Sequence, residues 1–302
     1  MAGLEVLFTG DLPPQMRLLR FVALCTLVAV WVAWRVAVAP PSPPPRPPAK
    51  PWVAQYGDAV VLGVPGNVFG TISYVYADRA SGACAVVDAC GHASYLTREM
   101  AARNWRLDGL LQTHGHLDHV QALPDYARRT GLTPRMHAGD ARMLRTFGIP
   151  TPDWRVMALP GVARATAATI AWILGMSRDR QPETAPLADG ELLTVGKLTL
   201  RVLWVPGHTP GSVCFYDAAN RVMFSGDFLM KGTVGRVDLP QGDEADMARS
   251  LRRIAALIPD DVVVLSGHTD PTTMGSEKRL NPHLAPYARR RGGAGGAPSE
   301  AP

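Results

Sequence analysis

The sequence predicts an α/β (α+β) domain, and three features of the chain lead to this fold class. From residue 52 onward, short runs rich in β-branched and aromatic residues alternate with stretches of helical periodicity. Turn signals built from Gly, Asp and Ser separate these runs. Several strand-like runs are followed, directly or after a glycine, by a histidine or an aspartate, so polar side chains are expected to gather where strands end.

The first half of this region is predicted to hold four strands and two helices. An antiparallel meander is expected because brief turns separate its three strands, at residues 60–64, 71–76 and 84–88. The elements that follow are a helix over 93–104, a strand over 109–113, and a helix that begins after Asp118 and ends near Gly131. Polar side chains just after residue 113 therefore lie at the carboxyl end of a strand.

The second half is predicted to hold further strands and one long helix. Two strands flank Gly196 within residues 192–205, a hairpin covers 212–216 and 221–225, an amphipathic helix covers 243–257, and a last buried strand covers 262–266. The apolar stretch 163–176 is either a lid over a site or a packed helix. The packed helix is the preferred interpretation.

Composition favours one globular domain with an appended N-terminus in this chain of 302 residues. The formal net charge is +5, and the arginines are scattered rather than gathered into the stripe that a nucleic-acid-binding protein presents. The four cysteines lack CxxC spacing, which argues against a disulfide framework or a zinc knuckle. Pairing of Cys84 with Cys90 in an oxidising compartment is the alternative to the buried free thiols that we expect.

The N-terminal segment is predicted to contact a membrane. Residues 18–39 are apolar except for Arg20, Thr26 and Arg35, and a helix of this length can just span a bilayer. A proline-rich linker in extended polyproline II conformation follows. The predicted organisation is an unstructured start over 1–17, the apolar segment over 18–39, the linker over 40–51, a domain over 52–290 and a disordered tail over 291–302.

Three interpretations of the apolar segment stay open. Ala37-Val38-Ala39 resembles a signal-peptide cleavage site, which would make the protein secreted, but Pro40 directly after it disfavours cleavage. A start at Met16 leaves an acid-free, arginine-bearing leader that resembles a transit peptide for the mitochondrion or another organelle. We expect a retained anchor, so that the protein is membrane-associated through residues 18–39.

The run Thr-His-Gly-His-Leu-Asp-His-Val at residues 113–120 predicts a metal site. His114 and His116 lie two apart at a strand end, so both imidazoles can reach one cation, whereas Asp118 and His119 face a second cation. Imidazole nitrogen and carboxylate oxygen are usual ligands of zinc, iron and manganese. A histidine cluster that binds nothing is disfavoured, because five of the eight histidines fall in this run or in two Gly-His steps downstream.

Three glycine steps further along the chain supply the remaining candidate ligands. His208, Asp227 and His268 each follow a strand-like run and a glycine. Glycine lets the backbone turn sharply, so the next side chain projects from the strand end toward a shared centre. His92, His137 and His283 lie outside this pattern and are expected at the surface or beside the ligands.

These motifs resemble those of the metallo-β-lactamase superfamily over about residues 60–284. The resemblance implies an αβ/βα four-layer sandwich with two divalent metal ions. Residues 226–243 and 267–282 are similar to glyoxalase II-like (hydroxyacylglutathione hydrolase-like) enzymes, in the short form without a helical C-terminal domain. The implied ligands are His114, His116 and His208 for the first metal, Asp118, His119 and His268 for the second, and Asp227 as the bridge.

The activity that this resemblance implies is metal-dependent hydrolysis of thioesters, with zinc expected and iron or manganese as alternatives. Two adjacent cations lower the pKa of a shared water and hold hydroxide beside an electrophilic carbonyl, so no protein nucleophile is required. Asp118 is the predicted catalytic residue because it orients that hydroxide. The predicted partner is a small-molecule thioester derived from glutathione; no nucleic acid is expected, and the oligomeric state is left open.

Two basic residues are predicted to contact the substrate. Arg236 follows Gly235 at a position that resembles the family's contact to a glutathione carboxylate, and Lys231 lies just before it. The alternative for Arg236 is a structural ion pair with Asp238 or Asp243.

Two other activities found on the same fold compete with thioester hydrolysis. A persulfide dioxygenase resembles the same motif set but uses a single iron, here held by His114, His208 and Asp227. A nucleic-acid-processing hydrolase brings a recognition insertion and a basic groove, and the sequence indicates neither. A non-enzymatic binding module is disfavoured because all seven ligand positions are filled.

Overall fold

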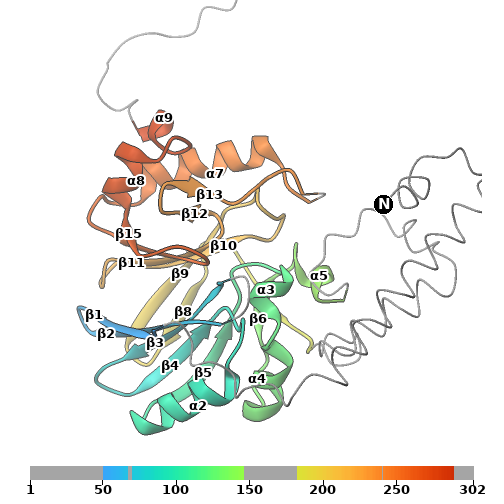
Figure 1. The fold of residues 1–302 in the computed structure, drawn as a ribbon, viewed down its shortest axis with the longest axis vertical. Helices are drawn as coiled ribbons and strands as arrows, with labels where there is room; N and C mark the ends of the chain where they lie inside the picture. Colours follow the sequence, from blue (N-terminus) through green and yellow to red (C-terminus); the bar gives the residue numbers. More distant parts are fainter. Residues whose placement is uncertain (1–49, 67–69, 146–181, 240, 289–302) are drawn as a thin grey trace, which may run out of the picture. The chain divides into compact units, whose positions relative to one another are not determined.

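The structure is a computed structural model that describes residues 50–66, 70–145, 182–239 and 241–288. These residues form two large β-sheets, a two-stranded ribbon and helices that lie outside the large sheets (Figure 1). The expectations for residues 1–49, for 163–176 and for the tail beyond 288 lie outside the described residues. None of the described helices is long and apolar enough to cross a membrane.

The first sheet has seven strands, in the spatial order β1-β2-β3-β4-β5-β6-β7. Strands β2 to β4 form the predicted antiparallel meander, β1 adds a fourth antiparallel strand at its edge, and β4 to β7 run parallel. Three of the strands, β1, β6 and β7, were not predicted, because runs of three to five residues carry too little periodicity. The strands are β1 (Trp52–Tyr56), β2 (Ala59–Pro65), β3 (Ile72–Asp78), β4 (Ala83–Val87), β5 (Arg106–Leu111), β6 (Arg135–His137) and β7 (Ala185–Leu187).

The second sheet has six strands, in the order β15-β14-β11-β10-β9-β8, and only β11 and β14 are parallel neighbours among them. The predicted strands around residue 196, the hairpin and the last buried strand are all present. The strands are β8 (Leu192–Val195), β9 (Leu198–Trp204), β10 (Val213–Asp217), β11 (Val222–Gly226), β14 (Val263–Ser266) and β15 (Thr272–Thr273). A separate ribbon pairs β12 (Leu229–Met230) with β13 (Thr233–Val234).

One predicted helix proves to be two. The helix expected from Asp118 to Gly131 divides after residue 120, because Pro124 at the start of the second piece lacks the N–H that a continuous helix needs. The N–H of Ala122 instead donates to the carbonyl of Ala89 (2.8 Å). The helices are α2 (Ala93–Ala102), α3 (Leu117–Val120), α4 (Leu123–Thr130), α5 (Ala141–Arg145), α7 (Glu244–Leu257), α8 (Met274–Leu280) and α9 (Ala285–Ala288).

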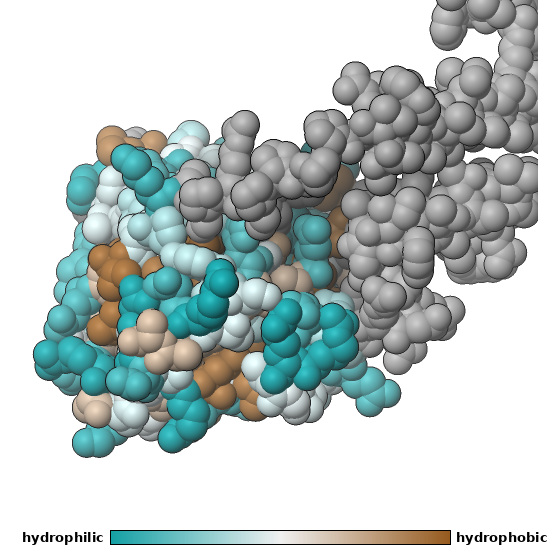
Figure 2. Space-filling view, turned by 60° about the horizontal axis from the view of Figure 1, so that its bottom comes forward, coloured by the Kyte–Doolittle hydropathy of each residue, from teal (hydrophilic) through white to brown (hydrophobic). Residues whose placement is uncertain are grey.

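Strand alternation divides the apolar side chains of the first sheet between two layers. On β3, Tyr74 and Tyr76 point between the two sheets, whereas Val75 and Ala77 pack with residues of α2 and α4. Figure 1 shows these helices on the outside of this sheet. Figure 2 brings this side of the molecule forward and shows hydrophilic residues over most of it, as expected for helices that bury one face only.

The second sheet follows the same rule. On β11, Phe224 points between the sheets and Met223 packs outward with Leu251 and Ile254 of α7. Helices α7 and α8 lie on the outside of this sheet (Figure 1). The order of layers is therefore helices, sheet, sheet, helices, which confirms the αβ/βα four-layer sandwich.

Three cysteines of the described residues, Cys84, Cys90 and Cys214, are buried, as expected, and no disulfide joins any two of them. Burial raises the pKa of Cys84 and of Cys90 to about 12, so both thiols stay protonated at neutral pH. The pairing of these two cysteines that was weighed as an alternative is not present.

Truncation of Phe224 is expected to destabilise the fold strongly. Its side chain is fully buried, and its ring centroid lies 5.3 Å from that of Tyr74 and 5.4 Å from that of Tyr76. Phe224→Ala should lower the free energy of unfolding by about 3–5 kcal/mol in urea titrations followed by circular dichroism. Leu280→Ala is the control, since Leu280 is 75% exposed; equal effects of the two variants would contradict the assigned core.

Candidate metal centre

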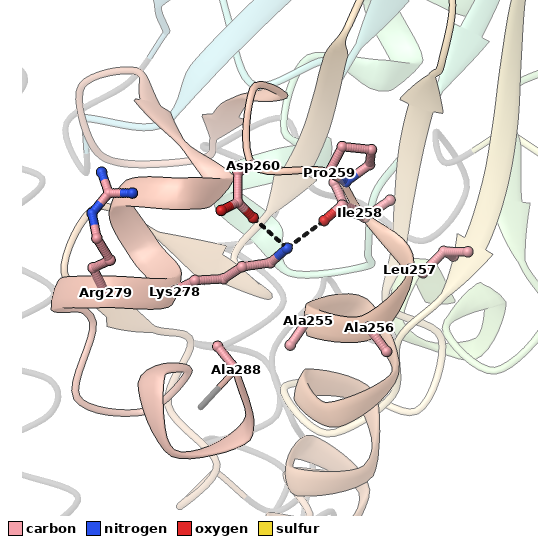
Figure 3. Close-up of a pocket in the computed structure, with 9 residues that line it drawn as sticks. All are labelled: Ala255, Ala256, Leu257, Ile258, Pro259, Asp260, Lys278, Arg279 and Ala288. Carbon is pink, nitrogen blue, oxygen red and sulfur yellow. Dashed lines mark hydrogen bonds and ion pairs between the residues drawn. The ribbon is translucent and has the colours of Figure 1, made fainter. Parts of the chain in front are cut away.

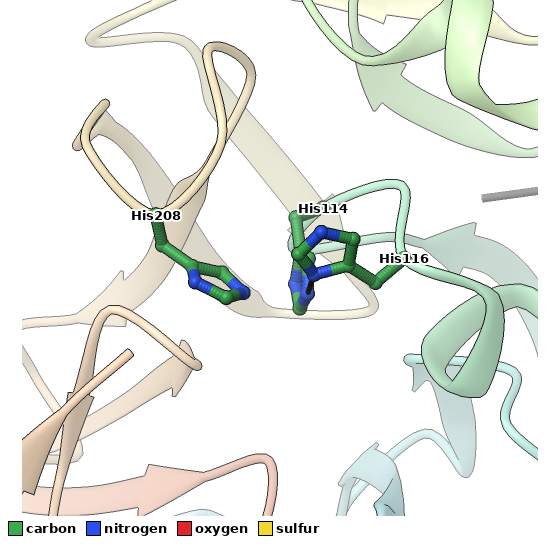
Figure 4. A group of neighbouring side chains, drawn as sticks. All are labelled: His114, His116 and His208. Carbon is green, nitrogen blue, oxygen red and sulfur yellow. Dashed lines mark hydrogen bonds between the residues drawn. The ribbon is translucent and has the colours of Figure 1, made fainter. Parts of the chain in front are cut away.

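All seven predicted ligands lie together at the carboxyl ends of strands. The loop after β5 carries His114 and His116, α3 carries Asp118 and His119, and His208, Asp227 and His268 follow β9, β11 and β14. Their ligand atoms, one from each residue, form three overlapping groups, and within each group these atoms lie within 4.8 Å of one another. The groups are His114, His116 and His208; His114, His119 and Asp227; and Asp118, His119 and His268. Figure 4 shows the first group, with its three imidazoles turned toward one another.

The spacing of the ligand atoms matches the size of a metal ion. His114 Nε2 lies 3.1 Å from His116 Nδ1, and His268 Nε2 lies 3.3 Å from His119 Nε2 and 3.2 Å from Asp118 Oδ2. Ligands bound at about 2.1 Å around a tetrahedral ion lie about 3.4 Å apart. The pairs of ring nitrogens face each other, so each pair needs a proton or a cation between its lone pairs.

Asp227 lies between the two predicted metal positions. Its Oδ2 is 3.6 Å from His208 Nε2 and 3.3 Å from His268 Nε2, and its Oδ1 is 3.3 Å from His119 Nε2. One carboxylate thus reaches a histidine predicted for the first metal and two histidines predicted for the second. This placement suits a bridging ligand.

Buried polar atoms without hydrogen bonds are concentrated in this centre. Within the described part of the chain, His116 Nε2, His208 Nε2 and Asp227 Oδ1 have no hydrogen-bond partner. Each such atom costs about 1–3 kcal/mol if nothing else satisfies it. The side chains present therefore fit divalent metal ions, and a set of imidazoles with few carboxylates suits zinc, iron or manganese better than calcium or magnesium.

Outer partners turn the metal-facing nitrogens inward. His119 Nδ1 lies 2.9 Å from Asp88 Oδ2, and His208 Nδ1 lies 2.8 Å from the carbonyl oxygen of Arg236. Since a carboxylate and a carbonyl only accept hydrogen bonds, Nδ1 carries the proton in both rings and Nε2 keeps its lone pair for a metal. The orientation of two ligands is therefore fixed from outside the centre.

Asp88 contacts the candidate centre and was missing from the predicted site. Its Oδ1 accepts the backbone N–H of Thr113 (2.8 Å), and its Oδ2 accepts the Thr113 hydroxyl (2.7 Å) as well as the ring of His119. Its φ of 56° is a left-handed conformation that costs a non-glycine residue roughly 1–2 kcal/mol. The available signal was a single aspartate that ends the apolar run Ala-Val-Val at residues 85–87.

The glycines before the ligands meet two different requirements. Gly226 has φ 51°, and a Cβ there would lie 2.4 Å from Thr113 Oγ1, so this step makes the predicted sharp turn. Gly267 has no positive φ. A Cβ at Gly267 would lie 2.4 Å from Asp227 Oδ1 and 2.6 Å from His119 Cε1. The prediction for Gly267 is thus corrected: this step needs room for the ligands rather than a turn.

Two imidazoles of the first group, those of His114 and His116, are held neutral. Burial and the neighbouring histidines lower the pKa of His114 well below its usual value and the pKa of His116 to about 3. Neutral imidazole is the form that binds a metal.

The second group carries protons when no cation balances the carboxylates. Burial lowers the pKa of His119, but Asp227 and Asp88 outweigh it and raise that pKa well above its usual value. Burial likewise opposes the hydrogen bonds of His268 to Asp118 and Asp227, which raise the pKa of His268 to about 9. Protons on the rings of His119 and His268 therefore balance the negative charge of the carboxylates, which bound cations would balance instead.

The two predicted substrate contacts lie beside the centre and are engaged in ion pairs. The Arg236 guanidinium donates from Nε and Nη2 to the carboxylate of Asp238 (2.7 Å each), which is one of the pairings weighed from the sequence. The Lys231 Nζ lies 3.4 Å from Asp270 Oδ2. Their roles in substrate binding stay predictions.

A surface pocket elsewhere on the domain is separate from this centre. It is lined by the end of α7, the turn after it, α8 and Ala288 (Figure 3), and it includes none of the seven candidate ligands. Lys278 Nζ in this pocket donates to the carbonyl of Ile258 (2.6 Å) and to Asp260 (2.7 Å). Lys278, one of two cations in the lining together with Arg279, is thus already paired within the chain.

Metal affinity is expected to rise with pH up to about pH 9. The pKa of His268 is raised to about 9, so below that pH a metal must displace its proton, and above it this competition ends. Calorimetric titration of the metal-free chain with zinc, in buffers of different protonation enthalpy, should show proton release that shrinks toward pH 9. His283→Ala, at an exposed histidine, should leave the profile unchanged; pH-independent affinity would contradict the assigned protonation.

The chain is similar to proteins of one known superfamily. A family model described as the metallo-beta-lactamase superfamily matches residues 66–268. The hydroxyacylglutathione hydrolase GloC of Haemophilus influenzae is 30% identical over 208 residues, which are 66% of this chain and 86% of that protein. The structure of BLEG-1 B3 metallo-beta-lactamase has a TM-score of 0.58 at 29% identity, covering 74% of this chain and 98% of that one. TTHA1623 in a di-iron-bound form has a TM-score of 0.55 at 26% identity, covering 78% and 100%. The chain therefore belongs to the metallo-β-lactamase superfamily.

Proposed function

We propose that the protein is a two-metal hydrolase of thioesters and that its substrates are thioesters of glutathione. The observation that carries this proposal is the position of Asp227 between two groups of ligand atoms, because a shared carboxylate holds two cations close together. The likeness to a hydroxyacylglutathione hydrolase supports the thioester class.

The chain's contribution to the chemistry is to hold a rigid, partly buried set of donors. When bound, two divalent cations would supply a water activated at neutral pH and a Lewis acid for the carbonyl oxygen. Asp88 and the Arg236 carbonyl fix the rings of His119 and His208 before any substrate arrives. Preorganised ligands of this kind spare the reaction the cost of rearranging them.

Asp118 is the proposed catalytic residue. The Thr71 hydroxyl donates to Asp118 Oδ2 (2.8 Å) and so fixes the carboxylate plane. The side chains of Asp118 and His268 are 21% and 24% exposed, whereas that of His119 is fully buried. Solvent and substrate therefore reach the centre from the side of Asp118, where its carboxylate accepts a hydrogen bond from the attacking water and orients it.

Arg236 and Lys231 suit the recognition of an anionic thioester at this opening. Their backbones touch the centre, since the Arg236 carbonyl accepts from His208 and the Lys231 N–H donates to Thr269 Oγ1, next to His268. Their side chains are 62% and 56% exposed. Exposed ion pairs contribute only about 0–1 kcal/mol, so a substrate carboxylate can replace Asp238 or Asp270 at little cost.

Loss of the Asp118 carboxylate is expected to abolish most of the activity. With S-D-lactoylglutathione and simpler acyl thioesters, Asp118→Ala should lower kcat/KM about 10²-fold or more, because both a second-metal ligand and the water-orienting group are removed. Asp125→Ala is the matched control, since Asp125 lies on α4 and pairs only with the exposed Arg128 and Arg129 among the described residues.

Two outcomes would contradict this assignment. Hydrolysis that survives Asp118→Ala unchanged would remove the support for a catalytic second metal position. Metal analysis that finds a single iron per chain, together with oxygen uptake on glutathione persulfide, would favour a persulfide dioxygenase instead.

Substitution of Arg236 is expected to separate binding from chemistry. Arg236→Ala should raise KM for S-D-lactoylglutathione about 10-fold with kcat unchanged, because the guanidinium binds the substrate tail equally in ground and transition states. A thioester without a carboxylate should show no change. Arg221→Ala, at an arginine that is 50% exposed and pairs with Asp261, is the matched control. An unchanged KM for both substrates would contradict the role of Arg236 in substrate binding, and its ion pair with Asp238 would then be its only assigned interaction.

A further inference from the structure

We infer that Asp140 is a positioning residue for the first metal: its carboxylate joins the two loops that carry His114, His116 and His208. This inference rests on the metal centre of the proposed function, but on neither the substrate nor the reaction. Asp140 lies between β6 and α5, is fully buried and is not one of the seven candidate ligands.

Three donors from the two loops converge on this carboxylate. Asp140 Oδ2 accepts the backbone N–H of Gly115 (2.9 Å) and the hydroxyl of Thr209 (2.6 Å), and Oδ1 accepts the backbone N–H of Gly211 (2.7 Å). Gly115 stands between His114 and His116, and Thr209 follows His208 directly. Each donor is therefore at most three residues from a candidate ligand.

The two loops belong to different sheets, so the contact fixes a distance between sheets. The loop with Gly115 follows β5 of the first sheet, and the loop with Thr209 joins β9 to β10 of the second. A backbone hydrogen bond from Val213 to the carbonyl of Thr113 (2.8 Å) links the same two loops at their base. Asp140 adds a second link between the two loops, close to the candidate ligands themselves. This second link restrains the distance between His116 and His208.

The backbones of the two loops pack closely around the Asp140 carboxylate. A Cβ at Gly211 would lie 2.6 Å from Asp140 Cγ, and a Cβ at Gly115 would lie 3.1 Å from Asp140 Cβ. A Cβ at Gly139 would in turn lie 3.0 Å from Gly211 Cα. Glycines at three converging positions thus let the backbone approach the carboxylate closely enough to donate.

A carboxylate suits this position because every group that faces it is a donor. Both oxygens accept at once, whereas an amide would in either orientation present its NH2 group to a backbone N–H, that of Gly115 or that of Gly211. Burial of a carboxylate is costly without such donors. Residues that orient metal ligands in this way typically change metal affinity 10- to 100-fold when they are substituted.

Asp140→Asn tests this inference, because it keeps the shape and turns one acceptor into a donor. We expect zinc to bind the first site of the pair about 10- to 100-fold more weakly in competition with a chromophoric chelator, while the second ion keeps its affinity. Cobalt(II) absorption of the loaded chain should change in the visible bands, which report the geometry of the ligands. Neither readout requires catalysis.

Asp217→Asn is the matched control. Asp217 is equally buried and accepts hydrogen bonds from the Tyr76 hydroxyl and from Asn220, at the end of β10 away from the His208 loop. It should lower the thermal unfolding temperature and leave zinc affinity and the cobalt spectrum as in the wild type. Equal losses of zinc affinity in the two variants, or none in Asp140→Asn, would overturn the inference.

Thr209 supplies a second, gentler test in case Asp140→Asn does not fold. Thr209→Val removes the hydroxyl that donates to Asp140 and should weaken zinc binding roughly 10-fold, whereas Thr209→Ser should restore it. No difference between these variants would overturn the inference, as would a wild-type chain that takes up no divalent metal. A chain that binds metal normally but hydrolyses no thioester would overturn the proposed function alone.

Discussion

The concentration of ionisable groups around Asp227 is the constraint on which the rest of the structure depends. Asp227 is 12% exposed and lies within 3.6 Å of ring nitrogens from three histidines. A charge removed from water is stable only if other charges or hydrogen bonds balance it. The short distance between opposed imidazole nitrogens and the raised pKa of His268 both follow from this need to balance buried charge. Divalent cations carry more positive charge than protons and therefore balance the carboxylates more completely.

The strand directions explain why these groups meet at one edge. In the first sheet β4, β5 and β6 are parallel, and in the second β11 is parallel to β14, so their carboxyl ends face the same way. The loops that follow these strands then carry the candidate ligands and the aspartates that contact them. Side chains far apart in the sequence, such as Asp118 and His268, come within 3.2 Å of each other for this reason.

The alternation of strands and helices and the seven candidate ligands could be predicted because their signals are local, whereas the four-layer arrangement was implied by the resemblance to the metallo-β-lactamase superfamily. A histidine that follows a glycine at a strand end is a signal within a few neighbouring residues, and the β-rich run that forms β3 (Ile72–Asp78) is equally local. Asp88 and Asp140 carry no such signal, since their partners lie 25 to 71 residues away. The same holds for Arg236: its side chain suggested a substrate contact, but nothing local indicates that its carbonyl orients His208.

The strand order also explains the division of labour between Asp88 and Asp140. β5 lies between β4 and β6, so the loop that leaves β5 is flanked by an aspartate from each neighbour. Asp88 accepts the N–H of Thr113 from one side and Asp140 accepts the N–H of Gly115 from the other. Asp88 also accepts a hydrogen bond from His119, a candidate ligand of the second metal. Asp140 also accepts one from Thr209, in the loop that carries His208, a candidate ligand of the first metal. A short loop with a glycine between its histidines is thus held by two carboxylates that are not candidate ligands themselves, and each of them reaches on to a different group of candidate ligands.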